Sequence, residues 1–149
     1  MAIKVISKEG KTAADLKAII NEIEILRVLD HPNICRYFET YETDKFMYLV
    51  MQYLPGGELF GSIEKFFESG EQYNEKIAAD MMKKILEALI HCHANKIVHR
   101  DIKPGNMLLD ADGNIVLVDF GLAKQFSSTM DEECGTPYFM PPEVIDGNY

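Results

Sequence analysis

Two short apolar runs, NMLLD at 106–110 and IVLVD at 115–119, are separated by Ala111-Asp112-Gly113-Asn114. Asp-Gly is a strong signal for a β-hairpin, because it tolerates the positive φ angles that a tight turn between antiparallel strands requires. The second run ends at Asp119, and the end of a strand can present a carboxylate to a cleft. We therefore expect an antiparallel hairpin with an acidic side chain at its exit.

Hydrophobic periodicity predicts further strands and helices along the chain. The strands are expected at 1–6, 34–41 and 46–54, and the helices at 14–29, from Leu59 onward and at about 74–94. The first helix ends before Pro32, because the residue before a proline is pushed out of the α region. The later two helices are expected to bury Leu59, Phe60, Ile63, Phe66 and Phe67, and Ala78, Met81, Ile85, Leu89 and Cys92. After Gly121 we expect only loop, and this order of elements predicts an α+β fold.

Composition narrows the class of protein. A length of 149 residues fits one domain with a real core, and 47% hydrophobic with 26% charged residues is typical of globular proteins. The net charge of −9 argues against a nucleic-acid surface, which needs clustered Lys and Arg. It is compatible with a basic partner, although such a charge is more often a solubility feature.

The three cysteines are widely spaced and odd in number, so no disulfide framework is implied. The first twenty residues contain several lysines and no apolar run, which argues against a signal peptide or a membrane span. We therefore expect a cytoplasmic protein in a reducing compartment.

The chemistry concentrates in HRDIKPGN at 99–106 and in Asp119, which lies between a valine run and Phe-Gly. One carboxylate, Asp101, can orient a hydroxyl and accept its proton. Asp119 with the amide oxygen of Asn106 suits Mg²⁺, which prefers oxygen ligands, and Lys103 can neutralise a phosphoryl oxygen. These are the parts that phosphoryl transfer requires. Solvated loop charges are the alternative, and the DFG at a matching distance argues against it.

HRDIKPGN, VDFG and CGTPYFMPPE together resemble the eukaryotic protein kinase family, over nearly the whole chain from AIK at 2–4 to PPE at 141–143. The lysine at position 103 resembles the residue that the serine/threonine branch has there. The segments GGELF and HPNI resemble those of the calcium/calmodulin-dependent and calcium-dependent kinases. The resemblance implies an ATP-dependent protein phosphotransferase that uses Mg²⁺ and acts on serine or threonine. It also implies a partial bilobal fold. Residues 1–50 would be small-lobe sheet and helix without the glycine-rich loop, 51–54 the hinge, and 55–149 the first half of the large lobe, ending after the activation segment.

The family's roles carry over residue by residue. Asp101 would position and deprotonate the substrate hydroxyl, and Lys103 would steady the γ-phosphate. Asn106 and Asp119 would hold Mg²⁺. Lys4 resembles the strand lysine that binds the α- and β-phosphates.

Glu22 matches the helical glutamate that pairs with that lysine. It lies between Ile19 and Leu26 and so interrupts an apolar helix face, where a carboxylate needs a cation. On spacing alone, a glutamate at the edge of the face is an equal alternative.

The resemblance also implies an adenine site. Met51 would be the gatekeeper before the hinge residues Gln52, Tyr53 and Leu54, whose backbone groups would face the adenine edge. Ala2 and Leu108 would sandwich the adenine, although both also fit as plain core residues. The residues matching the stacked spine between the lobes are Leu26, Tyr37, His99 and Phe120.

Glu58 is expected to lie at the ATP site. It also resembles a glutamate that contacts a substrate arginine, so the protein substrate is expected to be basic. Gly105 stands where the family usually has a second such glutamate, which argues against a two-arginine preference.

In the activation segment, Arg100 would meet a phosphate in related kinases, but the position of that phosphothreonine holds Glu132. A carboxylate there can pair with Arg100 and Lys124 without modification, so our hypothesis is that phosphorylation is not needed at this position. A solvated acidic loop is the alternative. Thr136 would bridge Asp101 and Lys103, and Glu143 would pair with an arginine further along the family's chain.

The family's glycine-rich loop and the second helical half of its large lobe find no counterpart in the sequence. Faces around Leu89, Val98 and Leu108 would then lack packing partners, so we expect a partial kinase domain that is unstable or inactive by itself. A catalytically inactive binding or regulatory module is the alternative function. A metal site at His91, Cys92 and His93 is disfavoured, because adjacent residues on a helix point in different directions.

Overall fold

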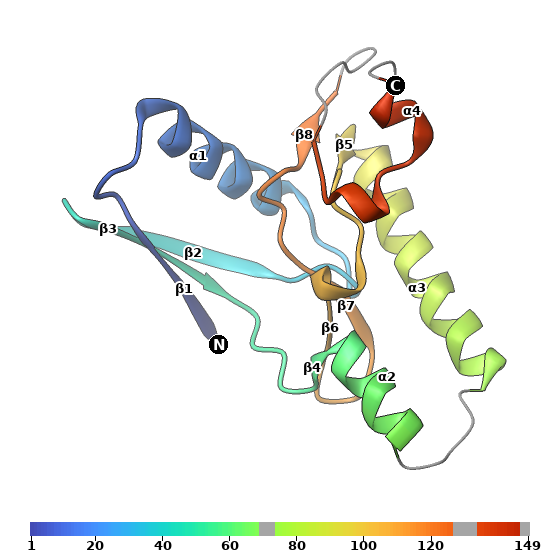
Figure 1. Cartoon of the computed structure of the whole chain (residues 1–149). Coiled ribbons are helices and arrows are strands. Elements are labelled where there is room, and N and C mark those ends of the chain that lie inside the picture. The colour runs from blue at the N-terminus through green and yellow to red at the C-terminus, as the bar shows by residue number, and fades with distance from the viewer. Residues whose placement is uncertain (69–73, 127–133, 147–149) are drawn as a thin grey trace.

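The computed structural model describes residues 1–68, 74–126 and 134–146 (Figure 1). The strands are β1 (Ala2–Ser7), β2 (Tyr37–Glu42), β3 (Phe46–Met51), β4 (Gly57–Glu58), β5 (Ile97–Val98), β6 (Met107–Leu109), β7 (Ile115–Leu117) and β8 (Lys124–Gln125). The α-helices are α1 (Ala13–Val28), α2 (Leu59–Glu68), α3 (Glu75–Ala94) and α4 (Pro142–Ile145), and single 3₁₀ turns cover Pro104–Asn106 and Pro137–Phe139. The predicted α+β class is confirmed.

The N-terminal part is a three-stranded antiparallel sheet, in the order β1-β3-β2, with α1 against it (Figure 1). A capping box starts α1, because the Thr12 hydroxyl accepts from the Asp15 N–H at 3.2 Å and the Asp15 carboxylate accepts from the Thr12 N–H at 2.8 Å. The helix ends at Val28, as Pro32 predicts. Ile23 packs on Met47 and Leu49 in the core beneath the helix.

The predicted hairpin is present as β6 and β7, and β4 adds a third strand to its edge. The Asp110 carboxylate accepts from the backbone N–H groups of Asp112 at 2.9 Å and Asn114 at 2.8 Å, and Gly113 has φ +77°. Gly56 crosses the hairpin so closely that a Cβ there would lie 2.6 Å from the Leu109 Cβ. Side-chain capping and glycine therefore determine where this small sheet turns and where the chain passes it.

Residues 33–35 join the two parts. The Cys35 N–H donates to the Leu117 carbonyl at 2.9 Å, and the Leu117 N–H donates to the Asn33 carbonyl at 2.8 Å. The Asn33 side chain donates to the Ile115 carbonyl at 2.7 Å. We call these three bonds the junction. They correct the predicted strand at 34–41, which begins only at Tyr37 because the preceding residues pair with β7 instead.

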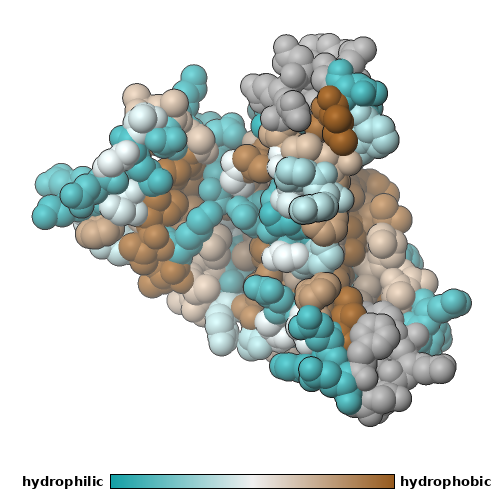
Figure 2. Space-filling model, in the orientation of Figure 1, coloured by the Kyte–Doolittle hydropathy of each residue, from teal (hydrophilic) through white to brown (hydrophobic). Residues whose placement is uncertain are grey.

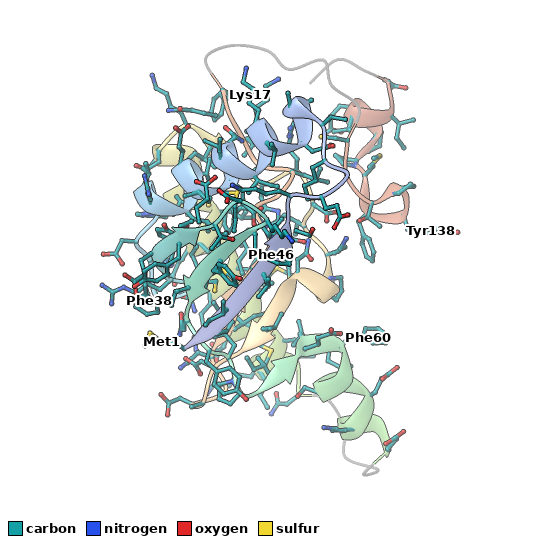
Figure 3. The ribbon with its side chains drawn as sticks, turned by 90° about the vertical axis from the view of Figure 1, so that its left-hand side faces the viewer. Met1, Lys17, Phe38, Phe46, Phe60 and Tyr138 are labelled. Atoms are coloured by element: carbon teal, nitrogen blue, oxygen red, sulfur yellow. The ribbon has the colours of Figure 1, made fainter. Side chains whose placement is uncertain are left out.

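The buried face of α3 also differs from the prediction. Ile85, Ala88 and Cys92 are buried, whereas Ala78 is exposed because the first turns of the helix lie beyond the core. On α2, Leu59 is buried and Ile63 packs against the core, but Phe60 is 52% exposed and projects outward (Figure 3). The side chains of Phe66 and Phe67 lie outside the described residues.

Three short elements after Gly121 correct the prediction of loop alone. β8 forms by pairing Lys124 with Val98, and a 3₁₀ turn and α4 follow in residues 137–145. None has a strong local signal, because β8 depends on a partner distant in sequence.

The faces that were expected to lack packing partners are those around Leu89, Val98 and Leu108, and each of these side chains is half-buried.

The most exposed apolar side chains of α3 are Met82, Leu86 and Ile90, at 55%, 52% and 67%. They recur every four residues along one face of the helix, and Figure 2 shows apolar surface over this part of the molecule. In the described residues, we find no helix that combines the length and the apolar character needed to cross a membrane.

Candidate active site

A cavity of about 440 Å³ lies between the β1-β3-β2 sheet and the β6–β7 hairpin. Its lining residues are Ala2, Lys4, Glu22, Leu26, Cys35, Met51, Gln52, Tyr53, Leu54, Leu108, Val118, Asp119 and Phe120. Most of these are apolar, and the polar side chains that carry chemistry lie together at Lys4, Glu22 and Asp119. The set contains the residues predicted to bind ATP, except that Glu58 is exposed on β4 and does not line the cavity. Such a cavity suits a flat apolar ring with an anionic extension.

An ion pair forms one wall of the cavity. Lys4 on β1 donates from its Nζ to the Glu22 Oε1 on α1 at 2.7 Å. The Glu22 side chain is 7% exposed and that of Lys4 is 39% exposed. A carboxylate so deeply buried requires this cation, and the alternative reading of Glu22 as an edge residue is wrong.

The Asp101 carboxylate is held by three side chains. Its Oδ1 accepts from the Thr136 hydroxyl at 2.6 Å, and its Oδ2 accepts from the Asn106 amide at 2.9 Å and lies 2.8 Å from the Lys103 Nζ. Lys103 also donates to Thr136 at 2.7 Å, so Thr136 bridges the lysine and the aspartate. Burial raises the pKa of Asp101, but the hydrogen bonds from Lys103, Thr136 and Asn106 outweigh it and leave the pKa below its ordinary value. Asp101 is therefore ionised at neutral pH.

His99 supports this loop from the core. Its Nδ1 accepts from the Asp101 N–H at 3.3 Å, so its Nε2 carries the proton and donates to the Val118 carbonyl at 3.0 Å. Burial lowers the pKa of His99 and keeps the ring neutral. The ring meets Phe120 edge-on, with 4.7 Å between centroids, and Leu26 and Tyr37 belong to the same packed cluster. The predicted spine residues therefore lie together.

Asn106 lies opposite Val118, the residue before Asp119, at the open end of the hairpin. The Val118 N–H donates to the Asn106 carbonyl at 2.9 Å, and Asp119 follows with a left-handed φ of +61°. A Cβ on Gly121 would lie 3.2 Å from the Asp119 Oδ1 and 3.8 Å from the Glu22 Oε2, so both carboxylates border this glycine.

The oxygen donors of Asn106 and Asp119 fit Mg²⁺, whose remaining ligands are commonly water and substrate phosphate. The described residues contain no cluster of three or more His, Cys, Asp or Glu side chains suited to a metal ion. His91, Cys92 and His93 accordingly do not form such a cluster.

A family model described as "Protein kinase domain" matches residues 1–149. The chain belongs to the protein kinase family. It is 42% identical over 149 residues to a calcium/calmodulin-dependent protein kinase type 1 of Macrobrachium nipponense, which confirms the resemblance to that group of serine/threonine kinases. The match covers 97% of this chain, which spans only 42% of the length of that curated relative.

The predicted hinge residue Leu54 lines the kinase cavity, which also includes Cys35 and Val118, two residues that the sequence analysis did not assign to the adenine site. Each reads as an ordinary core residue, because nothing in its local pattern distinguishes a cavity wall from a packed interior. Cys35 reaches the cavity because the junction bonds its backbone to β7. Burial raises the pKa of its thiol, so the group is uncharged at neutral pH.

The residues predicted for the activation segment are partly described. The Arg100 Nε donates to the Leu122 carbonyl at 2.8 Å, Lys124 lies on β8, and Glu143 is exposed on α4. Glu132 lies outside the described residues, so its predicted pairing with Arg100 and Lys124 stays a prediction.

Gly135 allows Thr136 to reach Asp101. It has φ +121°, and a Cβ there would lie 2.7 Å from the Arg100 carbonyl oxygen. We predict that Gly135→Ala lowers kcat/KM for a peptide substrate by about 10- to 100-fold, because backbone strain of about 1–3 kcal/mol displaces Thr136. Gly105→Ala is the matched control, since nothing lies within 4 Å of its Cβ, and it should retain near-normal activity. Equal activities of the two variants would contradict this role of Gly135.

Proposed function

We propose that the protein carrying this chain transfers the γ-phosphoryl group of MgATP to serine or threonine hydroxyls of protein substrates. The observation that supports it most is the Asp101 carboxylate, ionised and bonded to Lys103, Thr136 and Asn106. Asn106 meets the residue next to Asp119, and Asp119 lines the same cavity as the Lys4–Glu22 pair. The cation Lys4 and the carboxylate Asp119 therefore line one hollow of suitable size. The base Asp101 is bonded through Asn106 to the residue before Asp119.

MgATP is the first substrate in this proposal. The adenine would lie between Ala2 and Leu108, with backbone groups of Gln52 and Tyr53 facing its polar edge and Met51 behind it. Lys4, oriented by Glu22, would bind the α- and β-phosphates. Asn106 and Asp119 would hold the magnesium ion that accompanies the phosphates, and the ion would neutralise their charge.

In the transfer step, Asp101 accepts a hydrogen bond from the substrate hydroxyl and then its proton. The hydroxyl oxygen bonds to the γ-phosphorus, the bond from that phosphorus to the β,γ-bridging oxygen breaks, and ADP leaves. Lys103 stabilises the charge on the transferred group. A neutral Asp101 could not take the proton, so its lowered pKa supports this assignment.

We also propose the division into part of a small lobe at 1–50, a hinge at 51–54 and part of a large lobe at 55–149. The position of the cavity supports it, because Ala2 and Lys4 from the sheet, Gln52 and Tyr53 from the connection, and Leu108 from the hairpin all line it. The exposed carboxylate of Glu58, which follows the connection, supports a substrate with a basic residue near the acceptor.

Transfer of label from [γ-³²P]ATP to synthetic peptides tests the proposal directly. We expect Mg²⁺-dependent labelling of a peptide with one serine and an arginine three residues before it, and none of the same peptide with alanine or tyrosine at the acceptor. Replacing the arginine by glutamate should lower kcat/KM by about 10-fold or more, as for the loss of one charge pair. Labelling of tyrosine in preference to serine would contradict the assignment.

A second measurement distinguishes the enzyme from a catalytically inactive module. MgATP at about 100 times its dissociation constant should stabilise the protein by about 2.7 kcal/mol, which raises Tm measurably. A clear rise in Tm without transfer to any peptide would favour the inactive module. No rise in Tm and no transfer would contradict the proposed nucleotide site itself.

A further inference from the structure

Two histidine rings meet at a contact that is not part of the proposed active site. His31 lies in the loop that follows α1, and His91 lies in the last turn of α3. The ring centroids are 5.3 Å apart and the ring planes are inclined by 35°. Neither residue lines the MgATP cavity. The contact joins the end of the helix that carries Glu22 to the longest helix of the described chain.

His31 also participates in the hydrogen bonding around the junction. Its Nδ1 accepts from the backbone N–H of Asn33 at 3.1 Å. The Asn33 carbonyl and side chain are the groups that bond to β7 at Leu117 and Ile115. A proton on the His31 Nδ1 would turn this acceptor into a donor that faces another donor, so the bond that orients Asn33 would be lost.

His91 is equally unsuited to a second proton. Its Nε2 is buried and has no hydrogen-bond partner within the described chain. A charge on this ring would have to be buried opposite His31, and two imidazolium rings at this separation repel each other. The observed contact therefore belongs to the state in which both rings are neutral.

The charged groups around His31 do not offset the free-energy cost of protonating its ring. Glu87, one turn before His91 on α3, raises the pKa of His31, but it also forms an exposed ion pair with Lys83 at 3.9 Å. Asp30 and Arg36, of opposite charge, line the same hollow as His31. The β7 residues of the junction, Leu117 and Ile115, are apolar and contribute no charge. Burial and the neighbouring His91 together leave the pKa of His31 below its ordinary value.

We propose that the His31–His91 contact is a pH-sensitive latch between α1 and α3, closed when both rings are neutral and weakened when either is protonated. Opening of the latch loosens Asn33 and the end of α1. Because α1 carries Glu22, the Lys4–Glu22 pair then aligns less well, and MgATP binds more weakly. Only this last consequence rests on the proposed function, whereas the effect on stability does not.

The direction of the pH dependence follows from proton linkage. A histidine with a lowered pKa in the folded state binds protons less readily than in the unfolded state, so stability is lost as pH falls below the ordinary value of about 6.5. The loss levels off once pH lies below the folded-state pKa. His99 contributes with the same sign, since burial lowers its pKa too. The test must therefore separate the pair from His99.

The double variant His31→Asn/His91→Phe removes both imidazole rings of the contact and leaves His99 in place. Asparagine keeps an acceptor for the N–H two residues on, and phenylalanine keeps an aromatic ring at position 91. His93→Gln is the matched control, because His93 is exposed on the same turn of α3. The three proteins are compared in their natural full-length form by thermal unfolding and by titration with MgATP between about pH 7.5 and 5.5.

We expect the dissociation constant for MgATP to rise about threefold to tenfold on acidification in the natural protein and in His93→Gln, and clearly less in the double variant. Tm should fall on acidification in the same order. Equal pH slopes of the natural protein and the double variant would overturn the proposal. If MgATP does not bind at all, the proposed function fails, and the Tm slopes alone decide whether the latch exists.

If the double variant does not fold, an independent measurement can still be made on the natural protein. NMR titration of the histidine Cε1 protons reports each ring separately. The pKa of His31 should lie below the ordinary value, because burial and the neighbouring His91 ring lower it. An ordinary midpoint for His31 would overturn the proposal.

Discussion

Asp101→Asn is expected to lower kcat for peptide phosphorylation by about 10²- to 10⁴-fold, the contribution of a positioned general base. Asparagine can still accept from Thr136, but it cannot take up the substrate proton. It also loses the charge that pairs with Lys103 at 2.8 Å. MgATP binding should change little, because Asp101 does not line the nucleotide cavity.

Asp112→Asn is the matched control for this variant. Asp112 is exposed in the turn of the hairpin, where asparagine is equally well tolerated. The Asp112→Asn protein should therefore phosphorylate the peptide at the normal rate. Rates should be measured under single-turnover conditions, so that product release does not mask the chemical step. A fall of less than about 10-fold in Asp101→Asn would argue that another group takes the proton.

Lys4→Met should affect both nucleotide binding and stability. It removes the cation from the cavity and leaves the Glu22 carboxylate, 7% exposed, without its 2.7 Å partner. We expect a loss of about 1–3 kcal/mol of unfolding free energy, less than for a fully buried pair because Lys4 is partly exposed and screened by solvent. Peptide phosphorylation should fall by about 10²-fold or more, since the phosphates lose their positioning charge.

The double variant Lys4→Met/Glu22→Gln separates these two effects. Removing the orphaned charge should restore most of the lost stability, while activity should stay low because the phosphate-binding cation is still absent. Lys17→Met is the surface control, since Lys17 projects from α1 into solvent (Figure 3), and it should alter neither property. Recovery of activity in the double variant would contradict a phosphate-binding role for Lys4.

Local patterns predicted the elements whose bonds lie close in sequence. The Asp-Gly turn gave the correct hairpin because Asp110 caps it within four residues, and Pro32 gave the correct end of α1. The β5–β8 pair was missed because Val98 and Lys124 meet across a long stretch of chain. Phe60 was wrongly assigned to the buried side, because a helical pattern does not show how far the opposing surface extends.

The sequence alone, read through the kinase motifs, determined which side chains carry the proposed chemistry: Lys4, Glu22, Asp101, Lys103, Asn106, Asp119 and Thr136. Their residue types suffice for that, because the acid–base and ligand chemistry of a side chain depends mainly on its own atoms. The tertiary structure alone decided that Cys35 lines the cavity, that Glu58 does not, and that His31 meets His91. These outcomes depend on the junction at 33–35 and on long-range packing, which no local pattern of the sequence encodes.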